Sequence, residues 1–358
     1  FGPWQMMPGK LERRFLSAAA FHVKEKVQDA DGGDYDFNPF RAMQGAPKDV
    51  ETARTLAGKS KFKESENVLM KAWNSQLLDI GSADYYALYP KGWVDYKDNF
   101  RTRLSIEFFS PVIADNYRET SLPLAYFIFK AQNPTQDTLQ LSLMFTFPNL
   151  PVYRTAEKCA GIDKRAEEFE VKRYGLENVL RQEKNITGIL MTSSSEKNDR
   201  QVRNSEFCIA AREDSGIKIS WCRNFDGAGD GGDIWKQFAG QGRLEDFSRE
   251  PEEPAGALCA EITLAPGEAK EIPFALSWYF PVTELGRAGS QEYAQWWKKY
   301  TEFYPPCPGE KDTWNPDCIL SQAFAIARDG LEQLEENRRA VDAWMEPYLE
   351  NEKSAGKE

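Results

Sequence analysis

The residues of this chain that are best suited to acid–base chemistry are its carboxylates. Two carboxylates held a few ångströms apart can serve as general acid, general base or nucleophile. The chain has 56 Asp and Glu residues, so spacing along the sequence selects no pair. Asp95 and Asp115 stand out because each lies close to an aromatic residue, Trp93 and Tyr117 respectively. The alternative for Asp115 is a turn, in which it and Asn116 bond their own backbone.

The sequence offers few residues for other kinds of catalysis or for metal binding. His22 is the single histidine, and no GxSxG motif accompanies it. The six cysteines show no CxxC spacing, so neither a zinc site nor any other metal site is expected. Scattered free thiols are typical of a reducing compartment, which favours a cytoplasmic location. These cysteines are Cys159, Cys208, Cys222, Cys259, Cys307 and Cys318.

Residues 226–233 are the most glycine-rich segment of the chain. They lack the GxGxxG order and the Lys-Ser/Thr of a phosphate-binding loop. Aspartates alternate with glycine as in a calcium loop, but the terminal Glu of an EF-hand is missing. We therefore interpret this segment as a surface loop, with metal binding as the alternative.

Aromatic residues are abundant, with 10 Trp, 14 Tyr and 22 Phe. Several gather between Trp73 and Trp93. Such side chains can stack on a ring-shaped ligand, but they also fill cores and domain interfaces because they bury a large area. Both interpretations stay open at this point.

The first 280 residues carry the alternating pattern of β-strands. In residues 139–147, leucine and phenylalanine alternate with mostly polar residues, so one face is strongly apolar. Similar patterns predict strands at 103–108, 124–129, 207–212, 217–222, 258–264 and 270–280.

Three short segments with turn chemistry separate pairs of these strands, at 133–137, 214–216 and 265–268. Each contains Pro or Gly, which favour tight bends, so we predict three β-hairpins. Hairpins without βαβ alternation predict a mainly β fold, an antiparallel β-sandwich. In the second hairpin, Cys208 would lie opposite Cys222, with Cβ atoms about 4.5–5.5 Å apart and no disulfide.

The pattern changes after Pro305. Apolar residues from Leu320 to Met345 recur every three or four positions, as on one face of a helix. Asn315 and Pro316 suit the start of such a helix. We therefore expect a sandwich domain over residues 1–304 and a helical segment over 305–358.

This helix should dock on the flank of the sandwich, because about 39 Å of unbroken helix is longer than a typical strand. The C-terminal end of the helix should then extend beyond the sandwich, where no other part of the chain buries it. We expect Trp344, Met345 and Tyr348 to be less buried than Leu320 and Phe324.

Composition excludes some classes of protein. The net charge of −11 argues against a nucleic-acid binder, which needs a basic face. No run of 18 apolar residues encodes a transmembrane helix.

Two neighbouring segments carry the clearest resemblance to a known family. Tyr85–Tyr96 is YYALYPKGWVDY and Ser110–Leu124 is SPVIADNYRETSLPL. They are similar to the N-terminal domain of glycoside hydrolase family 116, the bile-acid β-glucosidase (non-lysosomal glucosylceramidase) family. Further similar segments, spread between Phe1 and Trp344, are Phe1–Gly9, Asn185–Ile189, Asp233–Leu244, Leu264–Glu268 and Phe274–Pro281. Tyr279 departs from the family pattern, where many members have Asp.

The resemblance implies that the catalytic residues lie elsewhere. Family members keep a Glu nucleophile and an Asp acid/base, for a retaining reaction, in an (α/α)6 barrel that would follow Glu358 in the same polypeptide. No catalytic residue and no cofactor are then expected here. Substrates would be β-glucosides or glucosylceramide, with xylosides in some members. The residues expected at the substrate rim or the domain interface are Trp73, Tyr85, Tyr89, Trp93, Asp95, Asp115 and Tyr117.

Two rival classes remain. One is a stand-alone carbohydrate-binding module, and the other is a structural scaffold that touches no sugar. Complete burial of the aromatics between Trp73 and Trp93 would favour the scaffold.

Overall fold

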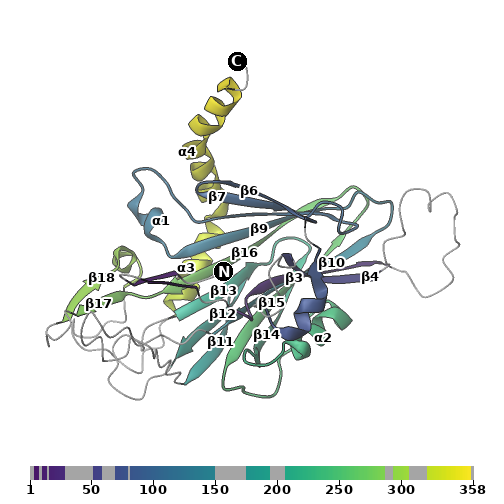
Figure 1. The fold of residues 1–358 in the computed structure, drawn as a ribbon, viewed down its shortest axis with the longest axis horizontal. Coiled ribbons are helices and arrows are strands. Elements are labelled where there is room, and N and C mark those ends of the chain that lie inside the picture. Colours follow the sequence, from purple (N-terminus) through teal and green to yellow (C-terminus); the bar gives the residue numbers. More distant parts are fainter. Residues whose placement is uncertain are drawn as a thin grey trace, which may run out of the picture.

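Two large β-sheets dominate the computed structural model (Figure 1). It describes residues 4–7, 10–13, 16–28, 51–58, 69–79, 81–149, 175–193, 206–286, 293–305 and 321–355. Every strand pair in these ranges is antiparallel except β4–β5. The predicted mainly β class is therefore confirmed.

The first sheet has six strands. Their order across the sheet is β14 (Ile217–Asp226), β15 (Pro254–Leu264), β10 (Leu139–Pro148), β3 (Ala20–Val27), β4 (Glu51–Gly58) and β5 (Leu77–Leu78).

The second sheet has eight strands. Their order is β11 (Leu176–Glu183), β12 (Ile186–Ser193), β13 (Glu206–Arg212), β16 (Ala269–Tyr279), β9 (Leu124–Gln132), β8 (Arg103–Phe109), β7 (Lys91–Asp95) and β6 (Asp84–Leu88). Two small two-stranded sheets pair β1 (Trp4–Met7) with β2 (Lys10–Arg13) and β17 (Val282–Gly286) with β18 (Tyr293–Trp297).

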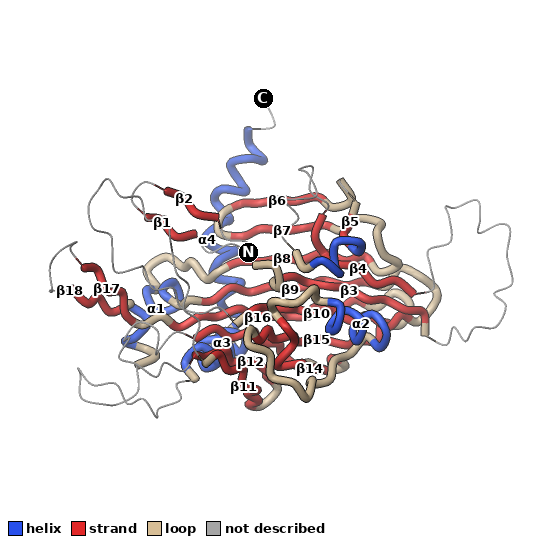
Figure 2. The backbone as a smooth tube through the Cα atoms, turned by 60° about the horizontal axis from the view of Figure 1, so that its bottom comes forward, coloured by secondary structure: helices blue, strands red, loops and turns tan. Residues whose placement is uncertain are grey.

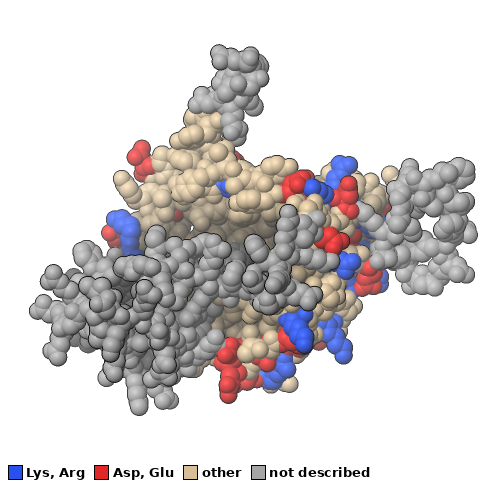
Figure 3. Space-filling view, in the orientation of Figure 1, with Lys and Arg blue, Asp and Glu red and all other residues tan. Residues whose placement is uncertain are grey.

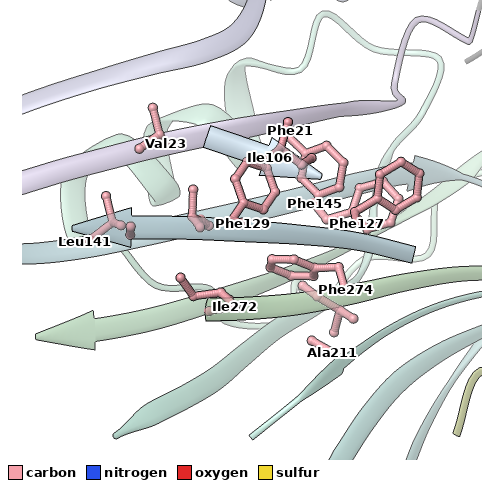
Figure 4. Packing of buried hydrophobic residues seen from close by; sticks show 14 of the residues in the cluster. Phe21, Val23, Ile106, Phe127, Phe129, Leu141, Phe145, Ala211, Ile272 and Phe274 are labelled. Carbon is pink, nitrogen blue, oxygen red and sulfur yellow. The ribbon is translucent and has the colours of Figure 1, made fainter. Parts of the chain in front are cut away.

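The two large sheets lie face to face as a sandwich (Figure 2). Their facing sides form one apolar core, in which aromatic rings from both sheets interlock (Figure 4). The ring of Phe21 stacks on Phe145 at 4.3 Å between centroids and meets Phe274 of the opposite sheet at 5.7 Å. Alternation along each strand therefore selects the residues that face this core.

All three predicted hairpins are wrong. The segments 133–137, 214–216 and 265–268 join β9 to β10, β13 to β14 and β15 to β16, and each of these pairs is divided between the two sheets. The turns therefore carry the chain across the sandwich instead of pairing neighbouring strands. Two of them lie side by side, since the amide of Gly267 donates to the carbonyl of Asn133 at 2.8 Å.

The predicted proximity of Cys208 and Cys222 fails for the same reason. Ile209 and Ile219 do face the common core, as the alternation predicted. The two cysteines consequently point to opposite outer sides of the sandwich, where each is buried under different helices. Alternation specifies the face of a residue, but it does not specify which strand lies beside it.

Helices cover the outer faces of both sheets. The helix α2 (Gly232–Gln241) and the short 3₁₀ helix η3 (Lys71–Gln76) cover the six-stranded sheet. The helix α3 (Gln322–Glu332) packs on β12, β13 and β16 of the eight-stranded sheet. Two short helices, α1 (Tyr117–Ser121) and the 3₁₀ helix η4 (Lys299–Glu302), lie next to each other.

The predicted single C-terminal helix is interrupted. It divides at Gln333 into α3 and α4 (Leu334–Ala355). The end of α4 projects from the body of the domain (Figure 1). The predicted start at Asn315 and Pro316 lies outside the described residues.

Strand β13 holds α3 at both ends. The carboxylate of Glu206 accepts a hydrogen bond from the Ala323 amide at 2.9 Å, at the helix start. The guanidinium of Arg212 donates to the Leu331 carbonyl at 2.7 Å, near the helix end. Glu206 accepts from the start of the helix and the Arg212 cation lies near its end, where the helix dipole favours positive charge, so β13 fixes both the position and the direction of α3.

A candidate docking surface around helix α4

The β6–β7 hairpin forms the edge of the eight-stranded sheet and carries aromatic residues on both faces. Tyr86 lies opposite Trp93 in the register, so both point to the outer face. Tyr85 points to the other face, where its ring stacks on Phe108 at 6.3 Å. Tyr86 is 57% exposed, so the outer face of this edge presents aromatic surface to solvent.

Helix α4 extends this aromatic surface. The ring of Trp344 meets Tyr89 at 6.0 Å and Tyr348 at 5.5 Å between centroids. Tyr89 is 70% exposed and Tyr348 is 55% exposed. We call the group Tyr86, Tyr89, Trp93, Trp344 and Tyr348 the aromatic patch. Mostly uncharged surface surrounds the base of α4 on the face seen in Figure 3, with a few charged side chains among it.

The expected exposure of the helix end is confirmed for two of three residues. Tyr348 is exposed and Trp344 half-buried, whereas Phe324 is only 1% exposed. The prediction for Met345 is wrong, since it is buried with Val341 against the sheet. Leu320 lies outside the described residues.

Beneath the aromatic patch lies an ionic network centred on Glu107 of β8. This carboxylate accepts hydrogen bonds from Lys91 Nζ at 2.7 Å and from Arg338 Nη2 at 2.7 Å. Lys91 also pairs with Asp342 of α4. The side chains of Lys91 and Glu107 are only 2% and 4% exposed. We call Lys91, Glu107, Arg338 and Asp342 the α4 ionic network.

The charges of the network compensate one another. Burial opposes ionisation of Glu107, but the hydrogen bonds from Arg338 and Lys91 outweigh it and lower the pKa of Glu107 to about 2. Lys130 approaches the same carboxylate at 3.2 Å from the solvent side. Glu107 therefore stays charged at neutral pH, and its partners keep that charge stable inside the protein.

The loop that carries Asp115 and Tyr117 lies at the same end of the sheet as Tyr89. Asp115 has a left-handed backbone with φ of 57°, and the Asn116 side chain accepts a hydrogen bond from the Glu119 amide at 3.1 Å. The turn interpretation therefore describes this segment. Tyr117 is highly exposed at the start of α1, and the neighbouring Arg118 lies over the ring of Phe303.

Asp95 and Asp115 are not brought together as a catalytic pair. Asp95 lies opposite Ser105, whereas Phe109, which precedes the loop of Asp115, lies opposite Lys91 at the other end of β7. Asp95 accepts a hydrogen bond from the Lys97 amide at 2.8 Å and lines an open hollow of about 490 Å³. An acid–base pair acting on one glycosidic bond needs a separation below about 9.5 Å.

Trp73 is fully buried, so its side chain offers no surface to a substrate or another domain. Its indole donates to the Gly231 carbonyl at 3.1 Å and packs edge-on against His22 at 4.5 Å. Burial lowers the pKa of His22 to about 3, so this imidazole is neutral. Among the predicted site residues, Trp73 therefore belongs to the core, and the others lie at the surface or are half-buried there.

The described part of the chain contains no group of three or more His, Cys, Asp or Glu residues placed to hold a metal ion. In the glycine-rich segment, Asp226 and Asp230 accept hydrogen bonds from the amides of Ala228 and Gly232. Likewise, no helix in the described ranges is long and apolar enough to span a membrane.

Sequence reasoning missed the α4 ionic network. Lys91 and Glu107 occupy outward positions of their strands, which the alternation assigns to solvent. One signal was available in α4, where Arg338 lies on the same helical stripe as Val341 and Met345. A charge on an otherwise apolar stripe suggests a buried partner.

Three solved structures align with parts of this chain. A protein from the human microbiome, provisionally assigned as a kojibiose phosphorylase, is 11% identical with a TM-score of 0.32, over 80% of this chain and 27% of that one. The galactosidase domain of an α-galactosidase–sucrose kinase is 10% identical with a TM-score of 0.21, over 56% of this chain and 26% of that one. A provisionally assigned aldose 1-epimerase from Escherichia coli K12 is 10% identical with a TM-score of 0.23, over 64% of this chain and 76% of that one. TM-scores this low carry no argument about function.

A match to a protein family covers far more of the sequence than the segments quoted above. The family profile described as "beta-glucosidase 2, glycosyl-hydrolase family 116 N-term" matches residues 1–316 of the 358. The chain therefore belongs to glycosyl-hydrolase family 116, within the N-terminal domain of its β-glucosidases.

Proposed function

We propose that this chain is the non-catalytic N-terminal domain of a retaining β-glucosidase, with β-glucosides or glucosylceramide as substrates. In this proposal, residues 1–304 form the sandwich, and residues 305–358 lead towards an (α/α)6 catalytic domain in the same polypeptide. The sandwich packs on that domain and shapes the rim of its active site. The family match supports the enzyme class, because it describes an N-terminal part of a β-glucosidase.

The observation that carries the docking role is the aromatic patch. Tyr86, Tyr89 and Tyr348 are each more than half exposed, although the chain has apolar cores in which other aromatics are buried. Tyr and Trp are enriched at interfaces because they combine a large apolar area with a polar group. A patch of this kind marks an interaction surface.

The rim role is proposed for the loop that follows β8. Asp115 and Tyr117 lie at the end of the sheet where Tyr89 also lies, so a domain docked on the aromatic patch would meet them. Tyr85 points to the opposite face of the hairpin and Asp95 to the opposite end. We therefore assign the rim to Asp115 and Tyr117 first.

We expect the isolated chain to release no chromophore from an aryl β-glucoside, because in this proposal the catalytic carboxylates lie in the (α/α)6 domain. The measurement is a continuous absorbance assay with the chain alone and with the polypeptide that includes the catalytic domain. Turnover by the isolated chain within about tenfold of the longer enzyme, removed by changing Asp95 or Asp115, would refute the proposal.

We expect Tyr89→Ala combined with Trp344→Ala to weaken the association of this chain with a separately produced catalytic domain by tenfold or more. Hot-spot residues, which are enriched in Trp and Tyr near the centre of an interface, cost about 2 kcal/mol or more when truncated. Isothermal titration calorimetry measures the dissociation constant, and Tyr85→Ala is the matched control on the opposite face. Equal weakening by the control would show that the aromatic patch has no special role. Binding of a β-glucoside by the isolated chain would favour the carbohydrate-binding alternative.

A further inference from the structure

Helix α4 contributes two opposite charges, one turn apart, and each meets an opposite charge on the sheet. Of the four charges that the sheet presents there, Lys91 and Glu107 are buried, whereas Lys130 and Glu271 are partly exposed. Arg338 holds Glu107 with a two-pronged contact, Nη2 to Oε2 at 2.7 Å and Nε to Oε1 at 3.2 Å. Asp342, four residues later, pairs with Lys91 of the neighbouring strand. The order of charges along α4 is therefore the complement of the order on the sheet.

This pattern disfavours displacement of α4 by one turn in either direction. If Asp342 moved to the place of Arg338, two carboxylates would face each other at the buried Glu107. If Arg338 moved to the place of Asp342, two cations would meet at the buried Lys91. Like charges brought together are unfavourable at side chains that are this deeply buried.

The apolar contacts of α4 specify its position less strictly. Val341 and Met345 are both buried and are also one turn apart, so each could fill much of the space of the other. The break at Gln333 separates α4 from α3, which β13 already holds at both ends. The first turn of α4 is also anchored by Asn337, whose buried side chain donates to the Tyr126 hydroxyl at 2.9 Å. Beyond that turn, the ionic network is the polar feature that distinguishes one placement of α4 from its neighbours.

The placement of α4 determines the shape of the aromatic patch. Trp344 and Tyr348 lie two and six residues beyond Asp342 on the same helix. The contact between Trp344 and Tyr89 at 6.0 Å joins the helix to the β6–β7 hairpin. A turn of displacement would move both α4 rings by about 5.4 Å along the hairpin.

We propose that the α4 ionic network sets the register of α4 on the sheet, and that Arg338 and Asp342 are thereby positioning residues for domain docking. The docking part of this inference rests on the proposed function. The register part does not, because it concerns only contacts within this chain. A buried ionic group is best attested as a device that specifies register, and this geometry is such a case.

The first test measures the position of α4 in the chain itself. Spin labels are placed at Ala343→Cys on α4 and Lys218→Cys on β14, with Cys159, Cys307 and Cys318 replaced by serine. The test variant combines Lys91→Met, Glu107→Met and Arg338→Met, which keeps most of the side-chain volume and removes three of the four charges of the network, leaving only the exposed Asp342. The control is Arg339→Met, on the exposed side of the same helix.

Double electron–electron resonance should give one narrow distance distribution for the parent and the control. The triple variant should give a broader distribution or a second distance, with its far-ultraviolet circular dichroism unchanged. Asp342→Arg is the second variant, because it changes an exposed side chain and sets like charges against Lys91. If the triple variant does not fold, the distance distribution of Asp342→Arg tests the register role by itself. A single unchanged distribution in the folded variants overturns the register role.

The second test uses the enzyme that includes the catalytic domain. The triple variant should lose tenfold or more in kcat/KM, while Arg339→Met retains the parent value. Wild-type kcat/KM in a variant whose α4 is displaced would overturn the positioning role of Arg338 and Asp342. That result would not count against the proposed function, which the calorimetric test of the aromatic patch examines separately. Failure of this inference and failure of the proposed function are therefore distinguishable.

Discussion

Phe324→Ala should lower the free energy of unfolding of this chain by about 3–5 kcal/mol. Phe324 is the large apolar side chain with which α3 packs on the eight-stranded sheet, and it is almost completely buried. Its ring lies directly over Gly188 of β12, where an added Cβ would come within 2.8 Å of the ring. The glycine lets the ring approach the backbone closely, so truncation leaves a cavity that neighbouring side chains fill poorly.

Urea unfolding followed by tryptophan fluorescence measures this loss. Phe303→Ala is the matched control, because Phe303 is partly exposed next to α1. We expect the control to cost less than about 1 kcal/mol. Equal losses for the two variants would mean that α3 is not an integral part of the sandwich.

The second large effect concerns Glu206 and pH. Burial raises the pKa of Glu206 to about 8, although the backbone amides of Ala323 and Gln322 favour the carboxylate. The ordinary pKa of this side chain is about 4.5, so the folded chain holds a proton that the unfolded chain has released between these values. Stability from this group is full below about pH 4.5 and is lost as pH rises towards 8. The expected loss is on the order of a few kcal/mol, since one pKa unit corresponds to about 1.4 kcal/mol.

Glu206→Gln should remove this dependence. The amide cannot ionise, but its oxygen can still accept the hydrogen bond from Ala323. We expect the variant to match the parent near pH 5 and to be the more stable protein near pH 8. Thermal unfolding at several pH values measures the difference, and Glu335→Gln, an exposed carboxyl on α4, is the control. A parallel pH profile for parent and Glu206→Gln would show that Glu206 does not titrate in this range.

Helices α3 and α4 are held on the eight-stranded sheet by different sets of contacts. α3 is held by apolar packing and by hydrogen bonds at its two ends. α4 is held by the ionic network together with the buried side chains of Val341 and Met345, and its end then leaves the domain surface. Helix α3 thus connects the sandwich to α4, whose outer end projects from the domain.

Local pattern in the sequence determined which residues face the core. Ile209 and Ile219 were assigned to the core side, and they lie there, because the two-residue period of a strand is a property of the backbone alone. The mainly β class followed from the same pattern, and the segments around Tyr85 and Ser110 carried the resemblance to the family that the profile match shows. None of these inferences requires knowledge of which strands are neighbours.

Only the tertiary structure determined which strands pair and which side chains other segments bury. A turn such as 214–216 has the same composition whether it joins two strands of one sheet or crosses between two sheets, so the pairing of β13 with β16 could not be predicted. Likewise, Lys91 and Glu107 have the alternation of solvent-facing residues, and only the placement of α4 over them makes them buried. Trp73 shares a sequence neighbourhood with exposed tyrosines but is covered by residues from distant segments, such as Gly231. Side-chain periodicity is local, whereas pairing and cover depend on contacts between residues far apart in the sequence.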